Sequence, residues 1–258
     1  MSDSTTLSGT VNSRLPTPTF VRTQTPGTKV LARDDRLVPK PPYTPLWCAR
    51  RGRILGPLWI FYSPKARRIV RLRGDIVYYA WLLLEAEPEV IELCEQPFSI
   101  HIKLDGRSQN ALVDIWAKTR PGSEFFVVAA YRRHLADCND RSSRRVNVLT
   151  AWATQSGAVF AVMPDVMIWR HPQYLSNWAH IVRFLGSRRV SADRDLVPLV
   201  HRAMGAKQRM TLRDIECSFS DAEPTAVRAS VFRLLHVGVV RADLRHQRIS
   251  AETVFELV

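Results

Sequence analysis

The sequence predicts an α/β domain followed by a smaller domain of three helices and a β-ribbon. Between residues 75 and 185, segments with apolar residues three and four apart alternate with short apolar strand patterns. After residue 195, three short helical patterns precede two strand-like segments, which is the pattern of a winged helix-turn-helix. With 258 residues, of which 46% are hydrophobic, the chain can bury a core in each domain.

The N-terminal segment, residues 1–45, is predicted to be a disordered arm. It is rich in Ser, Thr and Pro, and proline lacks the backbone N–H that a regular hydrogen-bonded ladder needs. Residues 1–20 contain no continuous apolar core of the kind that a secretory signal carries. We therefore expect a cytoplasmic protein, and the absence of any Cys-x-x-Cys pair fits reduced thiols.

The domain predicted for residues 46–186 begins with a helix over residues 75–87, because Ile76, Tyr79 and Leu83 share one helical face. Asp105-Gly106 predicts a turn. The other expected elements are strands over residues 98–102, 111–117 and 125–130, a helix over 143–154, a strand over 158–163 and a helix over 172–185. The segment 125–130 is apolar on both faces, so we place it in the middle of the sheet.

The domain predicted for residues 187–258 consists of helices over 196–204, 211–219 and 225–236 and strands over 239–241 and 247–249. The helix after the turn of a winged helix usually enters the major groove of DNA. The candidate residues for contact with a partner protein or DNA are Arg228 and Arg233 on that helix and Arg241, Arg245 and Arg248 on the wing. Residues 205–258 hold eight basic and seven acidic side chains, a near-balance that favours a protein partner.

The charge of the whole chain points to a polyanionic partner. Lys and Arg number 37 against 24 Asp and Glu, a formal net charge of +13. Nucleic acid is the expected partner, whereas a membrane would need a long apolar run or a basic amphipathic helix. The most basic segment contains Arg50, Arg51, Arg53, Lys65, Arg67, Arg68, Arg71 and Arg73 without one acidic residue. It predicts either a DNA-contacting surface or a solvated strand face.

Three runs of residues resemble the TnsA family of transposon endonuclease subunits. They read L-L-E-A-E-P-E-V at residues 83–90, C-E-Q-P at residues 94–97 and V-D-I at residues 113–115. Family members typically show L-E-x-D-P-x-V, then E-Q-P, then P-D-F, and later E-V-K. The resemblance covers residues 50–258 and implies the fold of PD-(D/E)XK restriction endonucleases, followed by a winged-helix domain. It also implies double-stranded DNA, a DDE transposase and an AAA+ regulator as partners.

The same resemblance implies a Mg²⁺ site of carboxylates, with a lysine that positions the attacking water. Its P-D-F acid corresponds to Asp114, which is present. The helix acid corresponds to Val77, and the E-V-K run corresponds to residues 129–131, where Ala129 and Tyr131 replace the ligand and the lysine. We therefore expect a subunit that binds DNA and proteins without strand cleavage and without a cofactor.

Two alternatives remain at this stage. An active Mg²⁺-dependent endonuclease that cuts transposon ends would need a rearranged site, in which Lys118 serves as a migrated lysine and Asp75 or Glu124 joins Asp114. A winged-helix transcriptional regulator would bind duplex DNA through residues 187–258 alone. Trp152, Trp169 and Trp178 are expected to be core residues, and the seven histidines match no metal-binding spacing.

Overall fold

A computed structural model describes residues 38–46, 56–104, 107–187 and 195–258 as a mixed α/β structure with several sheets. The strands are β1 (Leu58–Ser63), β2 (Arg68–Arg73), β3 (Val90–Glu95), β4 (Ser99–Leu104), β5 (Arg107–Leu112), β6 (Ile115–Thr119), β7 (Glu124–Ala130), β8 (Phe160–Pro164), β9 (Arg209–Thr211), β10 (Val240–Ala242) and β11 (Val254–Leu257). The helices are α1 (Asp75–Ala86), α2 (Arg132–Ala136), α3 (Arg141–Ser156), α4 (Asp165–Ile168), α5 (Pro172–Ser187), α6 (Leu196–Lys207), α7 (Leu212–Cys217) and α8 (Pro224–His236). None of these described helices is both long and apolar enough to cross a bilayer.

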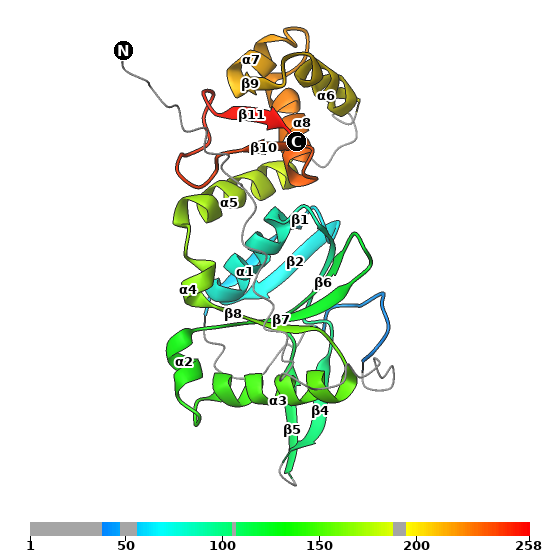
Figure 1. The fold of residues 1–258 in the computed structure, drawn as a ribbon, viewed down its shortest axis with the longest axis vertical. Coiled ribbons are helices and arrows are strands. Elements are labelled where there is room, and N and C mark those ends of the chain that lie inside the picture. Colours follow the sequence, from blue (N-terminus) through cyan, green and yellow to red (C-terminus); the bar gives the residue numbers. More distant parts are fainter. Residues whose placement is uncertain (1–37, 47–55, 105–106, 188–194) are drawn as a thin grey trace, which may run out of the picture.

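A four-stranded sheet with the order β3-β6-β7-β8 is the centre of the N-terminal unit, which comprises the described residues 38–187. Strand β6 is antiparallel to both β3 and β7, whereas β8 runs parallel to β7. Helix α1 covers one face of the sheet and α3 covers the other, while α5 packs against α1 and β1 (Figure 1). This arrangement agrees with the predicted α/β class.

Strand β7 lies between β6 and β8, as its apolar sequence predicts. Phe125 and Val127 join the core beneath α1, whereas Phe126 and Val128 face α3. Successive side chains of a strand point to opposite faces, so one apolar run serves two cores. On the α3 side, the rings of Phe126 and Trp152 lie 5.3 Å apart, in an edge-on arrangement.

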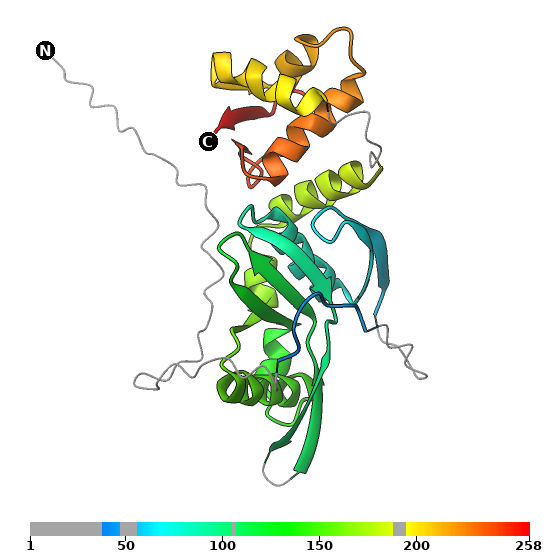
Figure 2. The same cartoon turned by 90° about the vertical axis from the view of Figure 1, so that its right-hand side faces the viewer.

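Two hairpins lie beside the central sheet: β1 with β2, and β4 with β5 (Figure 2). The prediction of one strand over residues 111–117 is wrong, because the chain changes its pairing partner there. Ala111 and Leu112 pair with β4, whereas Ile115 opens β6 in the central sheet. The sequence patterns also do not predict β3. The turn predicted at residues 105–106 lies outside the described residues.

The C-terminal unit, residues 195–258, consists of α6, α7, α8 and a three-stranded sheet with the order β10-β11-β9. The predicted helices are present, but the prediction of a strand over residues 247–249 is wrong: β11 covers Val254–Leu257 instead. Asn177 of α5 holds the segment 244–249 away from the sheet. Its amide donates to the carbonyl oxygens of Leu244 (2.9 Å) and Gln247 (2.7 Å) and accepts from the backbone N–H of Ile249 (3.1 Å).

The two units share a hydrophobic core. One buried cluster runs from Val70 and Trp81, through Trp178 of α5, to Phe232 and Phe255. Helix α5 lies between the central sheet and the C-terminal helices (Figure 1). Because the core continues across α5, the two units are packed against each other along this helix. The segment 188–194, next to the boundary predicted near residue 186, lies outside the described residues.

Candidate site around Asp114

Asp114 lies where the chain passes from β5 into β6. Its backbone N–H donates to the carbonyl oxygen of Val127 (3.2 Å), and its carbonyl oxygen accepts from the N–H of Gln96 (2.8 Å). Gln96 has a φ of 43°, an uncommon left-handed conformation that turns the E-Q-P run towards Asp114. The Asp114 residue is only 6% exposed. The V-D-I and E-Q-P runs therefore meet in space.

Both oxygens of the Asp114 carboxylate have protein partners. Oδ2 accepts from the backbone N–H of Ala129 (3.0 Å), and Oδ1 accepts from Nη2 of Arg145 (2.5 Å). Arg145, on α3, also donates from Nε (2.9 Å) and Nη2 (2.6 Å) to the carbonyl oxygen of Leu112. Charge-assisted hydrogen bonds of this length are strong. The guanidinium thus compensates the buried carboxylate and fixes the preceding turn.

The Mg²⁺ ion that the family resemblance implies does not fit this set of donors. Mg²⁺ takes oxygen ligands in octahedral geometry, and PD-(D/E)XK sites need two or three carboxylates to hold it. Here Asp114 supplies one carboxylate, and Arg145 brings a positive charge to it. Within the described ranges, no group of three or more His, Cys, Asp or Glu side chains is placed to hold a metal ion.

Asp114 and Ala129 lie in contact in the structure. The other two positions aligned with the family site, Val77 and Tyr131, supply neither a carboxylate nor a lysine. Val77 is half-buried and packs against the core beneath α1. Tyr131 follows β7, with its ring 5.7 Å from Trp169 and 5.1 Å from the guanidinium carbon of Arg133. Trp169 is 36% exposed, so its prediction as a core residue is wrong.

The side chains that were candidates for a rearranged site have other partners. Lys118 lies four residues from Asp114, roughly 13 Å along the chain, and Nζ forms an ion pair with Glu92 (2.9 Å). Glu124, at the opposite end of β7 from Ala129, accepts from Nε1 of Trp116 (3.3 Å). Asp75 accepts from Nε1 of Trp59 in β1 (2.9 Å). The structure does not bring these three side chains to Asp114.

The prediction that the whole basic segment contacts DNA is wrong for Lys65, which is 7% exposed. Its ammonium donates to the carbonyl oxygens of Leu84 (2.7 Å) and Glu87 at the C-terminal end of α1. Burial lowers the pKa of Lys65 to about 8, although the nearby carboxylates of Glu85 and Glu87 act in the opposite direction. Lys65 is therefore a structural residue that caps a helix.

The remaining basic residues of the segment have different surroundings. Arg68 forms two hydrogen bonds with the carboxylate of Glu95 (2.6 and 2.5 Å), which ties β2 to the E-Q-P run. Arg67 and Arg71 are exposed and Arg73 is half-buried, all on the β1–β2 hairpin. Arg50, Arg51 and Arg53 lie outside the described residues.

Glu85, in the L-E-x-x-P run, is a fully buried acid that several side chains contact. Its position in the sequence does not predict these contacts. It accepts hydrogen bonds from His236 Nε2 at the end of α8 (2.8 Å), from Trp81 Nε1 (3.2 Å) and from Ser63 Oγ. Burial alone would raise the pKa of Glu85, but His236, Lys65 and Ser63 outweigh burial and lower it. The only sequence signal is an acid on the helix face that also carries Trp81.

The arginines predicted for partner or DNA contact in the C-terminal unit are partly engaged within it. Arg228 is half-buried and pairs with Glu216 (2.8 Å), and Arg241 pairs with Glu256 (3.1 Å). Arg233 and Arg245 are half-buried, whereas Arg248 is exposed.

The prediction that α8 presents exposed arginines is wrong, because Arg228 and Arg233 are both half-buried. Nine of the 13 residues of α8 are buried. It packs against α5, α6 and α7. Pro224, Thr225, Arg228 and Arg233 are the residues of this helix that are not buried, so it presents only a narrow exposed face.

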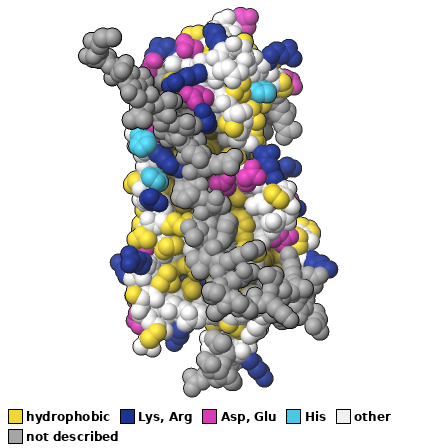
Figure 3. Space-filling view, viewed as in Figure 1, with side chains coloured by type: hydrophobic (Ala, Val, Ile, Leu, Met, Phe, Trp, Pro, Cys, Tyr) yellow, Lys and Arg dark blue, Asp and Glu magenta, His cyan; other side chains and the backbone are white. Residues whose placement is uncertain are grey.

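The charged side chains are distributed over both units. On the face shown in Figure 3, Lys and Arg side chains are spread along the molecule and interleaved with Asp and Glu.

The sequence matches no known protein-family model and no curated protein.

Proposed function

We propose that this protein is a TnsA-like subunit of a bacterial heteromeric transposase that binds double-stranded DNA and partner proteins without cutting DNA. The ion pair between Asp114 and Arg145 is the observation that supports the absence of DNA cleavage. In a metal-dependent nuclease, the cation at such a carboxylate generates the attacking hydroxide and stabilises developing charge. A guanidinium is a cation that cannot bind and acidify water as a metal does, so Asp114 here has a structural role.

The order of the elements supports a PD-(D/E)XK-like unit. Helix α1 precedes three antiparallel strands, β3, β6 and β7, and α3 then leads to β8. Asp114 meets Ala129 where the family has its acid and its E-V-K strand. The series α6, β9, α7, α8, β10 and β11, with three strands in one sheet, supports a winged-helix unit.

The C-terminal unit is proposed to meet partner proteins, a DDE transposase and an AAA+ regulator, and not the major groove. Two observations support this assignment. Helix α8, which would be the recognition helix, has nine of its 13 residues buried. The segment 244–249 that would lead into the wing is held on α5 by Asn177. The transcriptional-regulator alternative requires a free recognition helix, so it is disfavoured.

DNA binding is proposed on the net charge of +13. Release of counterions from the phosphates would drive the binding, so affinity would depend steeply on salt and little on sequence. No cofactor is needed for this role.

The test incubates the full chain with supercoiled plasmid DNA and Mg²⁺ or Mn²⁺. We expect the plasmid to be retarded in a gel at low salt but not converted to the nicked form. Asp114→Asn should behave like the wild type. Nicking that requires the metal ion and disappears in Asp114→Asn would overturn the proposal, and failure to retard DNA would remove its DNA-binding part.

A further inference from the structure

The β1–β2 hairpin carries three of the large apolar side chains that are most exposed among the described residues. Leu58 is 41% exposed, Ile60 is 57% exposed and Ile69 is 50% exposed. All three point to the outer face of the hairpin, because the inner face buries Val70 and Leu72 against the core. Contiguous apolar surface of this kind marks interaction sites more often than isolated exposed residues do.

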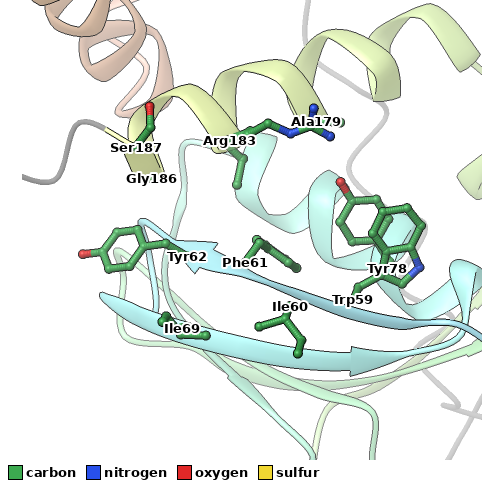
Figure 4. A pocket seen from close by; sticks show the side chains of 11 residues that line it. Trp59, Ile60, Phe61, Tyr62, Ile69, Tyr78, Ala179, Arg183, Gly186 and Ser187 are labelled. Carbon is green, nitrogen blue, oxygen red and sulfur yellow. The ribbon is translucent and has the colours of Figure 1, made fainter.

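A cavity of about 470 Å³ adjoins this face, between β1 and α5. Figure 4 shows Trp59 and Tyr78 at one end of the cavity and Tyr62, near Gly186, at the other. The Trp59 and Tyr78 rings are stacked, with centroids 4.0 Å apart, and form a rigid aromatic wall. The carboxylate of Asp75 accepts a hydrogen bond from Trp59 Nε1 (2.9 Å).

Arginines alternate with the apolar side chains of this surface. In the register of the hairpin, Leu58 lies opposite Arg73 and Ile60 lies opposite Arg71. Arg183 of α5 lines the cavity, and none of the described residues that line it is acidic. Positive charge therefore surrounds an apolar centre.

We propose that this surface, formed by the outer face of the hairpin and the adjoining cavity, docks an acidic segment of a partner protein that carries large apolar side chains. Exposed Leu and Ile side chains gain little from phosphate groups but are buried favourably by apolar side chains of a protein. The surrounding guanidinium groups complement carboxylates, which favours an acidic partner over a neutral one. The inference deepens the proposed function and rests on it for the identity of the partner class.

The test measures the binding of fluorescent 14-residue peptides to the full chain by anisotropy. The first peptide alternates Glu with Leu and Phe, the second replaces the apolar residues by Ser, and the third replaces Glu by Gln. A labelled 30-base-pair duplex is measured in parallel. We expect the first peptide to bind at least about tenfold more tightly than either of the others.

The matching variants are Ile60→Ser/Ile69→Ser and Arg71→Ala/Arg73→Ala. Each should weaken binding of the first peptide at least about tenfold. Val166→Ser removes an aliphatic side chain that is 55% exposed on α4, and Arg202→Ala removes an exposed arginine on α6; neither should change binding. Thermal unfolding checks that every variant is folded.

Several results would overturn the proposal. They are failure of the first peptide to bind, equal binding of the Ser-containing peptide, or an unchanged affinity in Ile60→Ser/Ile69→Ser. A loss of duplex affinity in that apolar variant would identify a DNA surface instead, and its conversion of a dimer into a monomer would identify a self-association surface. Metal-dependent nicking would refute the proposed function without affecting the peptide result, so the two failures are distinguishable.

Discussion

The ion pair between Asp114 and Arg145 illustrates how a buried carboxylate is compensated. Asp114 is removed from water, and each of its oxygens accepts a hydrogen bond, one from a backbone N–H and one from a guanidinium. Removing one member of a buried ion pair costs more than the pair itself contributes, because an uncompensated charge remains. Replacing Arg145 alone should therefore lower the free energy of unfolding more than replacing Arg145 and Asp114 together.

We predict that Arg145→Ala lowers the free energy of unfolding by about 3 kcal/mol, since it leaves the Asp114 carboxylate buried without its cation. Urea denaturation at neutral pH measures this loss. Arg144→Ala is the matched control, because Arg144 is exposed on the same helix and its removal should cost about 0.5 kcal/mol or less. In the Arg145→Ala background, Asp114→Asn should recover part of the loss. Equal losses in the two arginine variants would contradict the prediction.

The role of a single residue could be predicted from the sequence only where it depends on residues nearby in the chain. The V-D-I run identifies Asp114 as a candidate site residue, but its cation comes from Arg145, 31 residues later, on a helix whose pattern shows only an exposed basic end. Lys65 stands in a basic run that suggests a solvated charge. Only the packing of β1 against α1 shows that it caps a helix.

Helix α8 ends in a turn that brings Gly238 against the L-E-x-x-P run. The backbone N–H of Gly238 donates to the carbonyl oxygen of Leu235 (3.1 Å), and the N–H of Val239 donates to the carbonyl oxygen of Leu234 (2.9 Å). Gly238 has a φ of 80°, and a Cβ atom placed there would lie 2.6 Å from Cβ of Pro88. The glycine therefore permits both the left-handed conformation and the close approach of the two units.

We predict that Gly238→Ala destabilises the protein by more than about 2 kcal/mol, because strain at positive φ adds to a clash with Pro88. Gly122→Ala is the control: Gly122 has a φ of 86°, but its Cβ would meet nothing within 4 Å. That variant should show the conformational cost alone, about 1 kcal/mol. The difference between the two melting curves isolates the contact. Indistinguishable curves would contradict a tight packing of Gly238 on Pro88.

The sequence patterns predict long elements with a consistent face well, including α1, α3, α5 and β7, because periodicity persists over several turns or residues. They fail at elements whose ends are set by distant contacts. The change of pairing partner at residues 113–114 is marked in the sequence only by Asp114, and a single polar residue does not by itself end a predicted strand. The last strand begins at Val254 and not at residue 247, because Asn177 binds the preceding segment.

At the scale of the whole molecule, the two units are joined by a buried polar contact within their shared core. Glu85 of α1 and His236 of α8 are 151 residues apart in sequence, yet their side chains lie 2.8 Å apart. Lys65 and Ser63 complete the surroundings of the carboxylate. Stability of the interface is therefore coupled to the charge of one acid.

We predict that this coupling depends on pH below the ordinary pKa of glutamate. Since the folded-state pKa of Glu85 is lowered from 4.5, its contribution is fully present above pH 4.5 and is lost as the pH falls through the folded pKa. Glu85→Gln should cost about 3 kcal/mol at pH 7, and the deficit should shrink below pH 4.5.

Chemical denaturation across this pH range provides the measurement for the Glu85 prediction. Glu89→Gln serves as the control, because Glu89 is an exposed neighbour and its removal should have little effect at any pH. A deficit of Glu85→Gln that stays constant down to pH 3 would show that the carboxylate charge does not stabilise the interface.

The guanidinium of Arg145 also bears on the evolutionary history of such a protein. An acid that arose at Ala129 would stand close to a carboxylate whose charge the Arg145 guanidinium already compensates. A lineage that lost Arg145 first would inherit a less stable fold. Each order of these mutations passes through a variant with a poorly compensated charge, so Arg145 disfavours the appearance of a metal site at Asp114.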